Sequence, residues 1–374
     1  MDHPAKTTVH KPAEKEVIAP ETITAAAAME PAAVLQLMRH VADWQLQNPH
    51  PRRPQNHWIE ATGNLGIMTL AELTGDAHYA DALRGISSRM KWGFQPRRYF
   101  ADNHLIGETY LRLHQIDPKR ANIKPLRNLF DGILAKPKVF PSLDFRQPEI
   151  TDEWSWCDSL FMAPPLWALM GKVTGDSKYT DFMVHNWWRT ADFLYDKEEQ
   201  LYFRDSNYFD RPEANGRKKF WSRGNGWVLG GLMRVLDYLP QDHPARPRFE
   251  AHYKEFAARI AGLQQPDGFW HPGLLDPASY PQPETSGTGF FVAGLAWGIN
   301  SGRLDRATYE PVVRKGWQAL VNSVKPSGRV INVQPVGASP GRFDPDSSEP
   351  YGVGAFLLAG REIHRMAGGK DPQR

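Results

Sequence analysis

Apolar residues recur every three to four positions along most of the chain, which is the spacing of one face of an α-helix. From about residue 30 onward this spacing predicts about twelve helices, most of which end at clusters of Gly, Pro or Asp. Strand-like alternation is confined to short pieces such as 329–336. The chain is therefore predicted to be nearly all α, with helices at 31–46, 60–74, 78–93, 102–116, 122–135, 156–173, 177–195, 223–239, 246–264, 287–300, 305–324 and 349–366.

The links between these helices repeat along the chain. The segments ELTGDAHYADAL (72–83) and KVTGDSKYTDFM (172–183) share a helix end, Thr-Gly-Asp and a new helix start, and 299–312 follows the same logic with Ser-Gly and a later Asp. Gly ends a helix by adopting the left-handed conformation, and Asp accepts from the free N–H groups of the next helix. Such helix pairs build either an open solenoid or a ring. About twelve helices make six pairs, the number that closes an (α/α)6 barrel, and we expect this all-α toroid.

The first 29 residues lack any hydrophobic period and mix Lys, Glu, Pro and Thr. We expect 1–29 to be a disordered or loosely docked leader and 30–374 to be a single catalytic barrel domain. The leader lacks the basic start and apolar stretch of a secretory signal. We therefore expect a cytoplasmic location, and a periplasmic one is the alternative if a native signal peptide has been removed.

The composition of the chain argues against membranes and nucleic acids as its binding partners. The chain has 374 residues, of which 41% are hydrophobic, 23% are charged and 13 are Trp, which is typical of a soluble globular protein with an aromatic excess. The longest apolar run, 160–170, is too short to cross a membrane. The net charge of +3 is spread without the basic stripe that nucleic acid requires, and the single Cys157 forms no internal disulfide and is expected to be buried. We expect a monomer or weak homodimer with a small-molecule partner.

A first candidate site lies in the segment TDEWSWCDSLFMAPP (151–165). Trp154, Trp156 and Asp158 lie on one side of this segment if it is extended, and Trp154 and Asp158 still share a face if it is helical. Aromatic walls beside a carboxyl group raise its pKa, and a raised pKa suits a proton donor.

Helix capping is the alternative interpretation of the candidate carboxylates. Ser155 and Asp158 fit the capping box, so Asp158 would merely close a helix start. Asp102 precedes an amphipathic helix and is an equally plausible N-cap. The pair Pro164-Pro165 would break a helix that begins at Ser155, so the regular helix is expected to start near Pro164.

A second candidate site is KKFWSRGNGWVLGGLMRVLDYL (218–239). Arg223 and Trp227 stand four residues apart and share a helix face, and two glycines near the helix start would let a ligand approach the backbone. An Arg fork between Trp221 and Trp227 suits an acidic sugar, because guanidinium pairs with carboxylate and indole packs on a pyranose ring. The alternative is a helix entry whose Trp side chains belong to the core.

A third candidate is the long loop at 266–291, which ends in Glu284, Thr285 and Ser286. Long polar loops in compact folds are often functional, although Ser286 is equally well an N-cap. The chain has no His-x-x-x-His, Cys pair or carboxylate-rich calcium loop, and no phosphate loop or dinucleotide fingerprint. We therefore expect no metal and no cofactor.

Four segments in this order and spacing resemble the unsaturated rhamnogalacturonyl hydrolase family of glycoside hydrolases: WSWCDSLFMAPPLWALMGKVTGD, FWSRGNGWVLGGLMRVLDYLP, SYPQPETSGTGFFVAGLAWGINSGRLD and SSEPYGVGAFLLAGREI. The resemblance runs from about residue 30 to 366. It implies an (α/α)6 barrel that removes a 4,5-unsaturated uronic acid from the non-reducing end of oligosaccharides left by polysaccharide lyases, here fragments of pectin (rhamnogalacturonan).

The resemblance also implies roles for particular residues. Asp158 matches the catalytic Asp, which protonates ring carbon 4 and then activates the water that adds at carbon 5. Asp102 matches a second carboxylate that positions substrate or water, and the neighbouring Asn103 is the alternative position for it. Trp221, Arg223 and Trp227 match residues that hold the unsaturated sugar, and Trp154, Trp156 and Ser286 are expected to contact it.

One position departs from the family pattern. Where some members place a His in the substrate site, this chain has Arg204, which favours an acidic group on the substrate. The competing hypotheses are the same reaction on an unsaturated glucuronyl unit of another acidic polysaccharide, a non-catalytic sugar-binding toroid, and an inverting glycosidase that cleaves saturated substrates.

Overall fold

The computed structural model describes residues 17–147 and 149–372, and these residues are mostly helical. Two short strands, β1 (Tyr195–Asp196) and β2 (Leu201–Tyr202), pair antiparallel. The helices are α1 (Pro20–Ala27), α2 (Pro31–Gln47), α3 (Trp58–Thr74), α4 (Ala77–Arg89), α5 (Ile106–Ile116), α6 (Lys124–Ala135), α7 (Ser159–Met162), α8 (Pro164–Thr174), α9 (Ser177–Leu194), α10 (Ser222–Tyr238), α11 (Arg246–Ala261), α12 (Thr285–Asn300), α13 (Arg306–Asn322) and α14 (Pro350–Met366). Four short 3₁₀ turns, η1 (Ala101–His104), η2 (Pro118–Arg120), η3 (Ile150–Asp152) and η4 (Ser206–Tyr208), lie between them.

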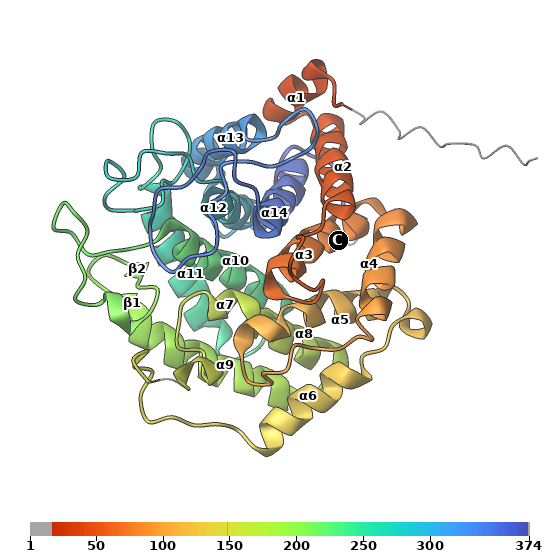
Figure 1. Ribbon diagram of the computed structural model, residues 1–374, viewed down its shortest axis with the longest axis vertical. Coiled ribbons are helices and arrows are strands. Elements are labelled where there is room, and N and C mark those ends of the chain that lie inside the picture. Colours follow the sequence, from red (N-terminus) through yellow and green to blue (C-terminus); the bar gives the residue numbers. More distant parts are fainter. Residues whose placement is uncertain (1–16, 148, 373–374) are drawn as a thin grey trace, which may run out of the picture.

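The helices form two concentric rings. The helices α3, α5, α8, α10, α12 and α14 are buried around most of their circumference, and each contacts the next until α14 packs back on α3. The intervening helices α2, α4, α6, α9, α11 and α13 are amphipathic and lie outside them (Figure 1). This closure confirms the predicted (α/α)6 barrel and excludes the open solenoid.

The repeated Thr-Gly-Asp links are the short turns between an inner helix and the next outer one. Gly75 and Gly175 take the left-handed conformation, with φ of 64° and 70°. Asp76 and Asp176 each accept a hydrogen bond from the backbone N–H two residues further on. The predicted left-handed Gly at the helix end and the predicted capping Asp at the next helix start are both confirmed. Each depends only on neighbouring residues.

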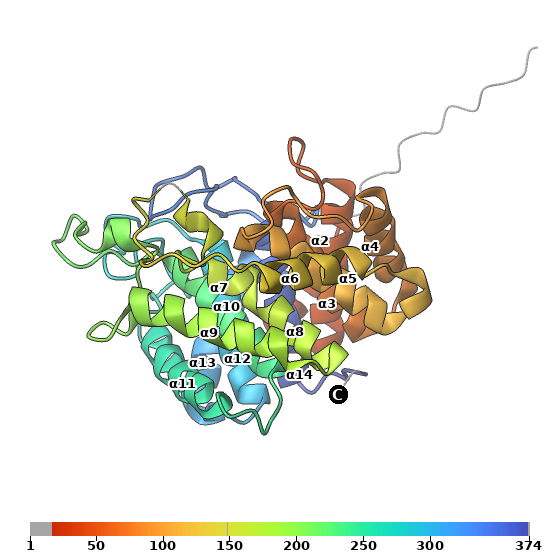
Figure 2. The same ribbon diagram turned by 90° about the horizontal axis from the view of Figure 1, so that it is seen from below.

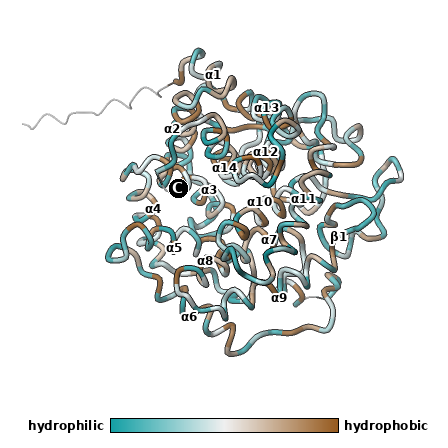
Figure 3. The backbone as a smooth tube through the Cα atoms, turned by 180° about the vertical axis from the view of Figure 1, so that it is seen from behind, coloured by the Kyte–Doolittle hydropathy of each residue, from teal (hydrophilic) through white to brown (hydrophobic). Residues whose placement is uncertain are grey.

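The connections at the opposite end of the barrel are long. Because each pair of helices is antiparallel, all inner helices run in the same direction and begin at one end. The segments that lead from an outer helix to the next inner helix gather there, on the upper side of Figure 2, and this end is called the loop end below. The loops around β1 are largely hydrophilic (Figure 3). All three candidate segments precede or begin inner helices, so the fold brings them to the loop end.

Three elements differ in detail from the sequence-based expectation. Part of the predicted leader is helix α1, where Ala26 is fully buried and its carbonyl accepts from Trp317 Nε1 at 2.8 Å, whereas 1–16 lie outside the described residues. The predicted helix 156–173 is divided at Ala163, and the regular helix begins at Pro164 as the proline pair predicted. The strand-like piece 329–336 is irregular apart from an isolated bridge between Val330 and Val324, and the carbonyls of Gln334 and Pro335 accept from Arg223 instead of a neighbouring strand.

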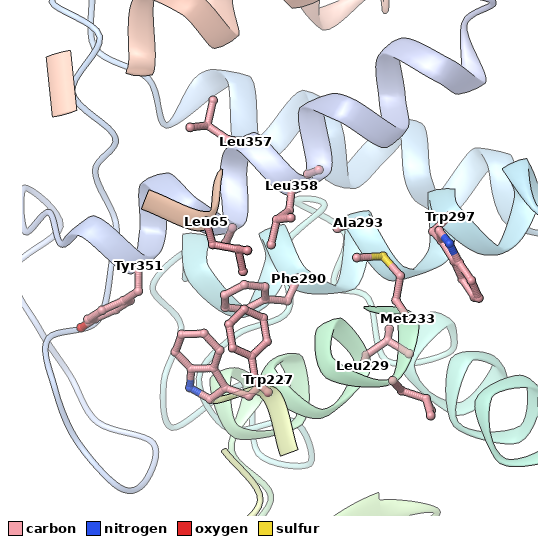
Figure 4. Packing of buried hydrophobic residues seen from close by; sticks show 14 of the residues in the cluster. Leu65, Trp227, Leu229, Met233, Phe290, Ala293, Trp297, Tyr351, Leu357 and Leu358 are labelled. Atoms are coloured by element: carbon pink, nitrogen blue, oxygen red, sulfur yellow. The ribbon is translucent and has the colours of Figure 1, made fainter. Parts of the chain in front are cut away.

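The core between the inner helices is rich in aromatic rings. Trp227 lies 4.4 Å from Phe290 and 4.6 Å from Phe161, centroid to centroid, and Figure 4 shows Trp227 of α10 and Phe290 of α12 close together. Trp167, Trp297 and Trp317 are also at most 1% exposed, and Trp44 is half-buried.

Close packing of α10 on α7 leads to a stability prediction. A methyl group at Gly231 would lie 2.2 Å from the Leu160 carbonyl oxygen, so Gly231→Ala should cost about 1 to 3 kcal/mol of unfolding free energy through overpacking. Thermal or urea unfolding measures the loss. Gly262→Ala is the matched control, because a Cβ there meets no atom closer than 3.6 Å. Equal stability of the two variants would contradict the packing argument.

Candidate active site

Two carboxylates occupy neighbouring positions at the loop end. Asp158 directly precedes α7, and Asp102 lies in η1, which leads into the inner helix α5. Asp158 is 8% exposed, and its charge is, after burial, the second cause of the raised pKa of Asp102. The structure thus brings the two predicted catalytic residues together.

Neither carboxylate serves as a helix cap. Asp158 makes no side-chain capping hydrogen bond, and Ser155 Oγ donates instead to the Ile150 carbonyl at 3.0 Å. Asp102 Oδ1 is buried and has no hydrogen-bond partner among the described residues. The residue in the cap position of α5 is Leu105. The capping interpretation is therefore wrong for both residues, and a buried oxygen without a partner indicates a group kept for a ligand or a reaction.

Burial dominates the electrostatics of the pair. Burial, followed by repulsion from Asp158, raises the pKa of Asp102 to about 7, against the opposing charges of Arg204 and Arg97. Burial also raises the pKa of Asp158, against the charges of Arg204 and Arg223. Two carboxyl groups that repel each other in this way share one proton over a wide range of pH. The pair is thus suited to give and take a proton near neutral pH.

Arg204 is the nearest cation to this pair. Its Nε lies 3.7 Å from Asp158 Oδ2 and has no hydrogen-bond partner among the described residues, while Nη1 donates to Asp205 at 2.6 Å. The Arg204 carbonyl accepts from the Cys157 N–H at 2.8 Å, and its guanidinium lies 5.0 Å from the Phe145 ring. Arg204 is therefore fixed on three sides with one donor unused, which suits the predicted contact with an acidic substrate.

Arg223 plays a different part from the one predicted. Its guanidinium donates to the carbonyl oxygens of Gln334 and Pro335 and is only 1% exposed. It is sandwiched between Trp221, at 4.4 Å, and Tyr351, at 4.8 Å. The fork expected to bind a substrate carboxylate is thus occupied by backbone carbonyls, and Arg223 holds the irregular segment 331–341 against the barrel.

The remaining predicted contacts, Trp154, Trp156, Trp221, Trp227 and Ser286, are at most 5% exposed. Trp221 donates from Nε1 to Gln334 Oε1 at 2.8 Å, and Trp156 stacks on Phe100, just before Asp102 in the chain, at 5.2 Å. Three others are buried in packing instead of lining a sugar site, which corrects the expectation. Trp154 packs edge-on to Phe182, Trp227 belongs to the aromatic core, and Ser286 donates to Glu284, the residue that caps α12.

The glycines in this region serve packing, not ligand approach. A Cβ at Gly224 would lie 3.1 Å from Cys157 Sγ, and one at Gly226 would lie 3.1 Å from the Gly287 Cα. Cys157 itself is fully buried, as expected. The backbone near the start of α10 is thus covered by protein, which corrects the prediction that a ligand reaches it.

The sequence-based reasoning missed several residues at the loop end. Trp58 stacks on Tyr351 at 5.5 Å, and the Tyr351 hydroxyl donates to the Gln334 carbonyl at 2.7 Å. Glu349 directly precedes α14, and its Oε2 is buried without a hydrogen-bond partner among the described residues. Their common signal is position, because each lies at the start of an inner helix or in the segment before it.

The described residues hold neither a metal-binding cluster nor a membrane-spanning helix. Across 17–147 and 149–372, no group of three or more His, Cys, Asp or Glu side chains is placed to hold a metal ion. Over the same ranges, every helix is too short or too polar to span a lipid bilayer.

The chain is similar to known proteins in both sequence and fold. The model of a family described as Glycosyl Hydrolase Family 88 matches residues 32–367. An unsaturated 3S-rhamnoglycuronyl hydrolase of Formosa agariphila is 39% identical over 87% of this chain and 88% of its own length. A protein of the same name from an Alteromonas species is 36% identical over 86% and 83%. A solved structure of a family 88 glycosyl hydrolase from Bacteroides vulgatus superposes with a TM-score of 0.81 at 31% identity, covering 90% of this chain and 99% of that one.

Proposed function

The chain belongs to glycosyl hydrolase family 88 and is a glycosidase that removes an unsaturated uronic acid from oligosaccharides, and we propose that this uronic acid is linked to rhamnose. The observation that carries the proposal is the pair Asp158 and Asp102, buried, without caps and beside Arg204. The names of the two relatives described above support rhamnose as the neighbouring sugar.

The parent uronic acid does not decide between the competing substrates. Galacturonic and glucuronic acid differ only in the configuration of ring carbon 4, and a lyase converts this carbon into part of a double bond. The unsaturated sugar is therefore the same for a pectin fragment and for a glucuronyl polysaccharide. Specificity for one or the other must come from the glycosidic bond at carbon 1 and from the sugar that follows, so the choice lies in the residues beyond Asp158.

We assign the proton transfers to Asp158. Its carboxyl group gives a proton to carbon 4 of the vinyl ether, and the resulting carboxylate takes a proton from the water that adds at carbon 5. The product is a hemiketal at carbon 5, which opens to a ketone and leaves a hemiacetal at carbon 1. That hemiacetal then releases the rest of the oligosaccharide as an alcohol. Burial raises the pKa of Asp158, which favours the protonated form that the first step requires.

Arg204 and Asp102 are proposed to position the substrate and the water for these proton transfers. The unused Nε of Arg204 is placed to donate to the carboxylate of the uronic acid while its charge stabilises ionised Asp158. The buried Oδ1 of Asp102 is available to accept from a sugar hydroxyl or from the attacking water. Asn103, the alternative position, donates from Nδ2 to the Arg97 carbonyl at 2.9 Å and is thereby engaged in the fold.

An absorbance assay tests the proposed function. The enzyme should consume an unsaturated uronic acid linked to rhamnose, with loss of the ultraviolet absorbance of the conjugated double bond. The saturated counterpart of the same disaccharide is the control and should remain intact, because it lacks the vinyl ether. Consumption of the saturated sugar would favour an inverting glycosidase. If the protein consumes no unsaturated oligosaccharide from any lyase digest, the proposed hydrolase activity is contradicted.

A further inference from the structure

The two oxygens of the Asp158 carboxyl group have different surroundings. Oδ2 accepts from the Cys157 thiol, with 3.5 Å between oxygen and sulfur, and faces Arg204 Nε at 3.7 Å. Among the described residues, no side chain donates to Oδ1. The carboxyl group therefore has one oxygen turned toward donors of the protein and one oxygen left for a ligand.

Other contacts hold both donors in place. The Cys157 N–H donates to the Arg204 carbonyl at 2.8 Å, so these two residues lie side by side. The sulfur is packed against α10, where a Cβ at Gly224 would lie only 3.1 Å from it. Arg204 Nη1 donates at 2.6 Å to Asp205, which is itself 1% exposed. The thiol and Arg204 Nε thus approach the same oxygen from fixed positions.

The Cys157 side chain is a thiol donor at neutral pH and not a thiolate. Burial, followed by the charge of Asp158, raises the pKa of this thiol well above its ordinary value. Burial raises the pKa of Asp158, whereas the charges of Arg204 and Arg223 and the hydrogen bond from Cys157 lower it. Asp102 is the anion that faces Asp158 from η1. A thiol is a weak donor, so it stabilises ionised Asp158 in the same sense as Arg204 but less.

We propose that the two oxygens of Asp158 have separate tasks: Oδ1 carries the proton that is exchanged with the substrate, and Oδ2 remains an acceptor that Cys157 and Arg204 orient. This inference rests on the proposed function. A protonated carboxyl group has one hydroxyl oxygen and one carbonyl oxygen, and the oxygen that faces two donors has to be the carbonyl. Oδ1 gives its proton to carbon 4 and takes one from the water that adds at carbon 5, so it ends the cycle protonated as it began. Cys157 is thereby a positioning residue.

The single thiol of the chain allows a test that needs no turnover. Cys157 is the only cysteine, so the S–H stretching band in the infrared spectrum reports on this residue alone. As the pH is raised and Asp158 ionises, the band of the wild-type protein should move to lower wavenumber, because the thiol then donates to a charged oxygen. In Asp158→Asn the acceptor does not titrate, and the band should keep one position. A wild-type band that ignores pH, or one that titrates alike in Asp158→Asn, would overturn the proposal.

Kinetic variants test Cys157 as a positioning donor. Cys157→Ala removes the donor and should lower kcat about 3- to 10-fold, the range of one neutral hydrogen bond, and should move the alkaline limb of the kcat/KM profile to higher pH. Cys157→Ser keeps a donor and should bring both values back near wild type. Ser87→Ala is the control, because it removes a small buried donor from the outer helix α4, where Ser87 Oγ donates to the Leu83 carbonyl at 2.7 Å. It should leave the profile unchanged.

The infrared and kinetic results separate this inference from the proposed function. Equal shifts of the limb in Cys157→Ala and Cys157→Ser would mean that the volume of the side chain matters and not its donor, and would contradict the positioning role. Turnover by a wild-type protein whose S–H band does not titrate would overturn the separate tasks alone. Absence of turnover on every unsaturated oligosaccharide, with a band that titrates as expected, would contradict the proposed function.

Discussion

Replacing Asp158 with Asn is expected to lower kcat about 10³-fold or more while the protein folds as before, since positioned acid–base groups contribute at this scale. The amide has nearly the same shape as the carboxyl group but neither gives a proton to carbon 4 nor takes one from water. Asp158 makes no capping hydrogen bond whose loss would disturb α7. The absorbance assay on unsaturated uronyl-rhamnose measures the rate, and thermal unfolding measures the fold.

The control for this variant is Asp176→Asn, the same chemical change at a surface N-cap of α9. Asn caps as well as Asp does, so rate and stability should both stay near wild type. The Asp158→Asn variant should still bind the unsaturated disaccharide at equilibrium, because the side chains of Trp221 and Arg204 are unchanged. Turnover by Asp158→Asn within about tenfold of wild type would exclude Asp158 as the acid and base.

The sequence predicts the architecture because its signals are local. Helix period, the left-handed Gly75 and Gly175, and the capping Asp76 and Asp176 each depend on a few neighbouring residues. The alternation of long and short links then places the inner-helix starts at one end. Helix α1 gives no such signal, because it spans only two turns and is mostly Ala, Thr and Glu, a composition without a clear apolar face.

The candidate site is only partly predictable because its partners are distant in sequence. The four-residue spacing of Arg223 and Trp227 puts both on one side of α10 but does not say which side faces the core. Arg223 finds its acceptors at Gln334 and Pro335, more than a hundred residues further along the chain. No pattern around 218–239 indicates that partner. Trp227 likewise packs on the distant Phe161 and Phe290, whereas Ser286 is engaged locally, by Glu284 two residues before it.

The structure decides whether the carboxylates of Asp158 and Asp102 cap helices, which the sequence leaves open. Local rules allow Asp158 and Asp102 to cap helices, and only the missing hydrogen bonds decide against it. The helix starts collected at the loop end add a favourable field, since each inner helix directs the positive end of its dipole there. Together with Arg204, this field suits a substrate that carries negative charge.

The pH dependence of Asp102→Asn is the sharpest test of the paired carboxylates. Wild-type kcat/KM should fall on the alkaline side as the shared proton is lost, since burial raises the pKa of Asp102 to about 7 and raises the pKa of Asp158 as well. Asn at 102 cannot ionise, so Asp158 loses a repelling neighbour and its pKa falls. The alkaline limb of the profile should therefore move to lower pH, and kcat should fall about 10²-fold because a group that positions substrate or water is gone.

Arg204→Gln should move the same limb in the opposite direction. Arg204 stabilises ionised Asp158 from 3.7 Å, so its removal raises the pKa of Asp158 and extends activity to higher pH, although at a lower rate. Arg97→Gln is a graded control, because this half-exposed cation acts on Asp102 after Arg204 and should give a smaller shift of the same sign. Shifts of equal sign in Asp102→Asn and Arg204→Gln would mean that a group other than this pair titrates in the profile.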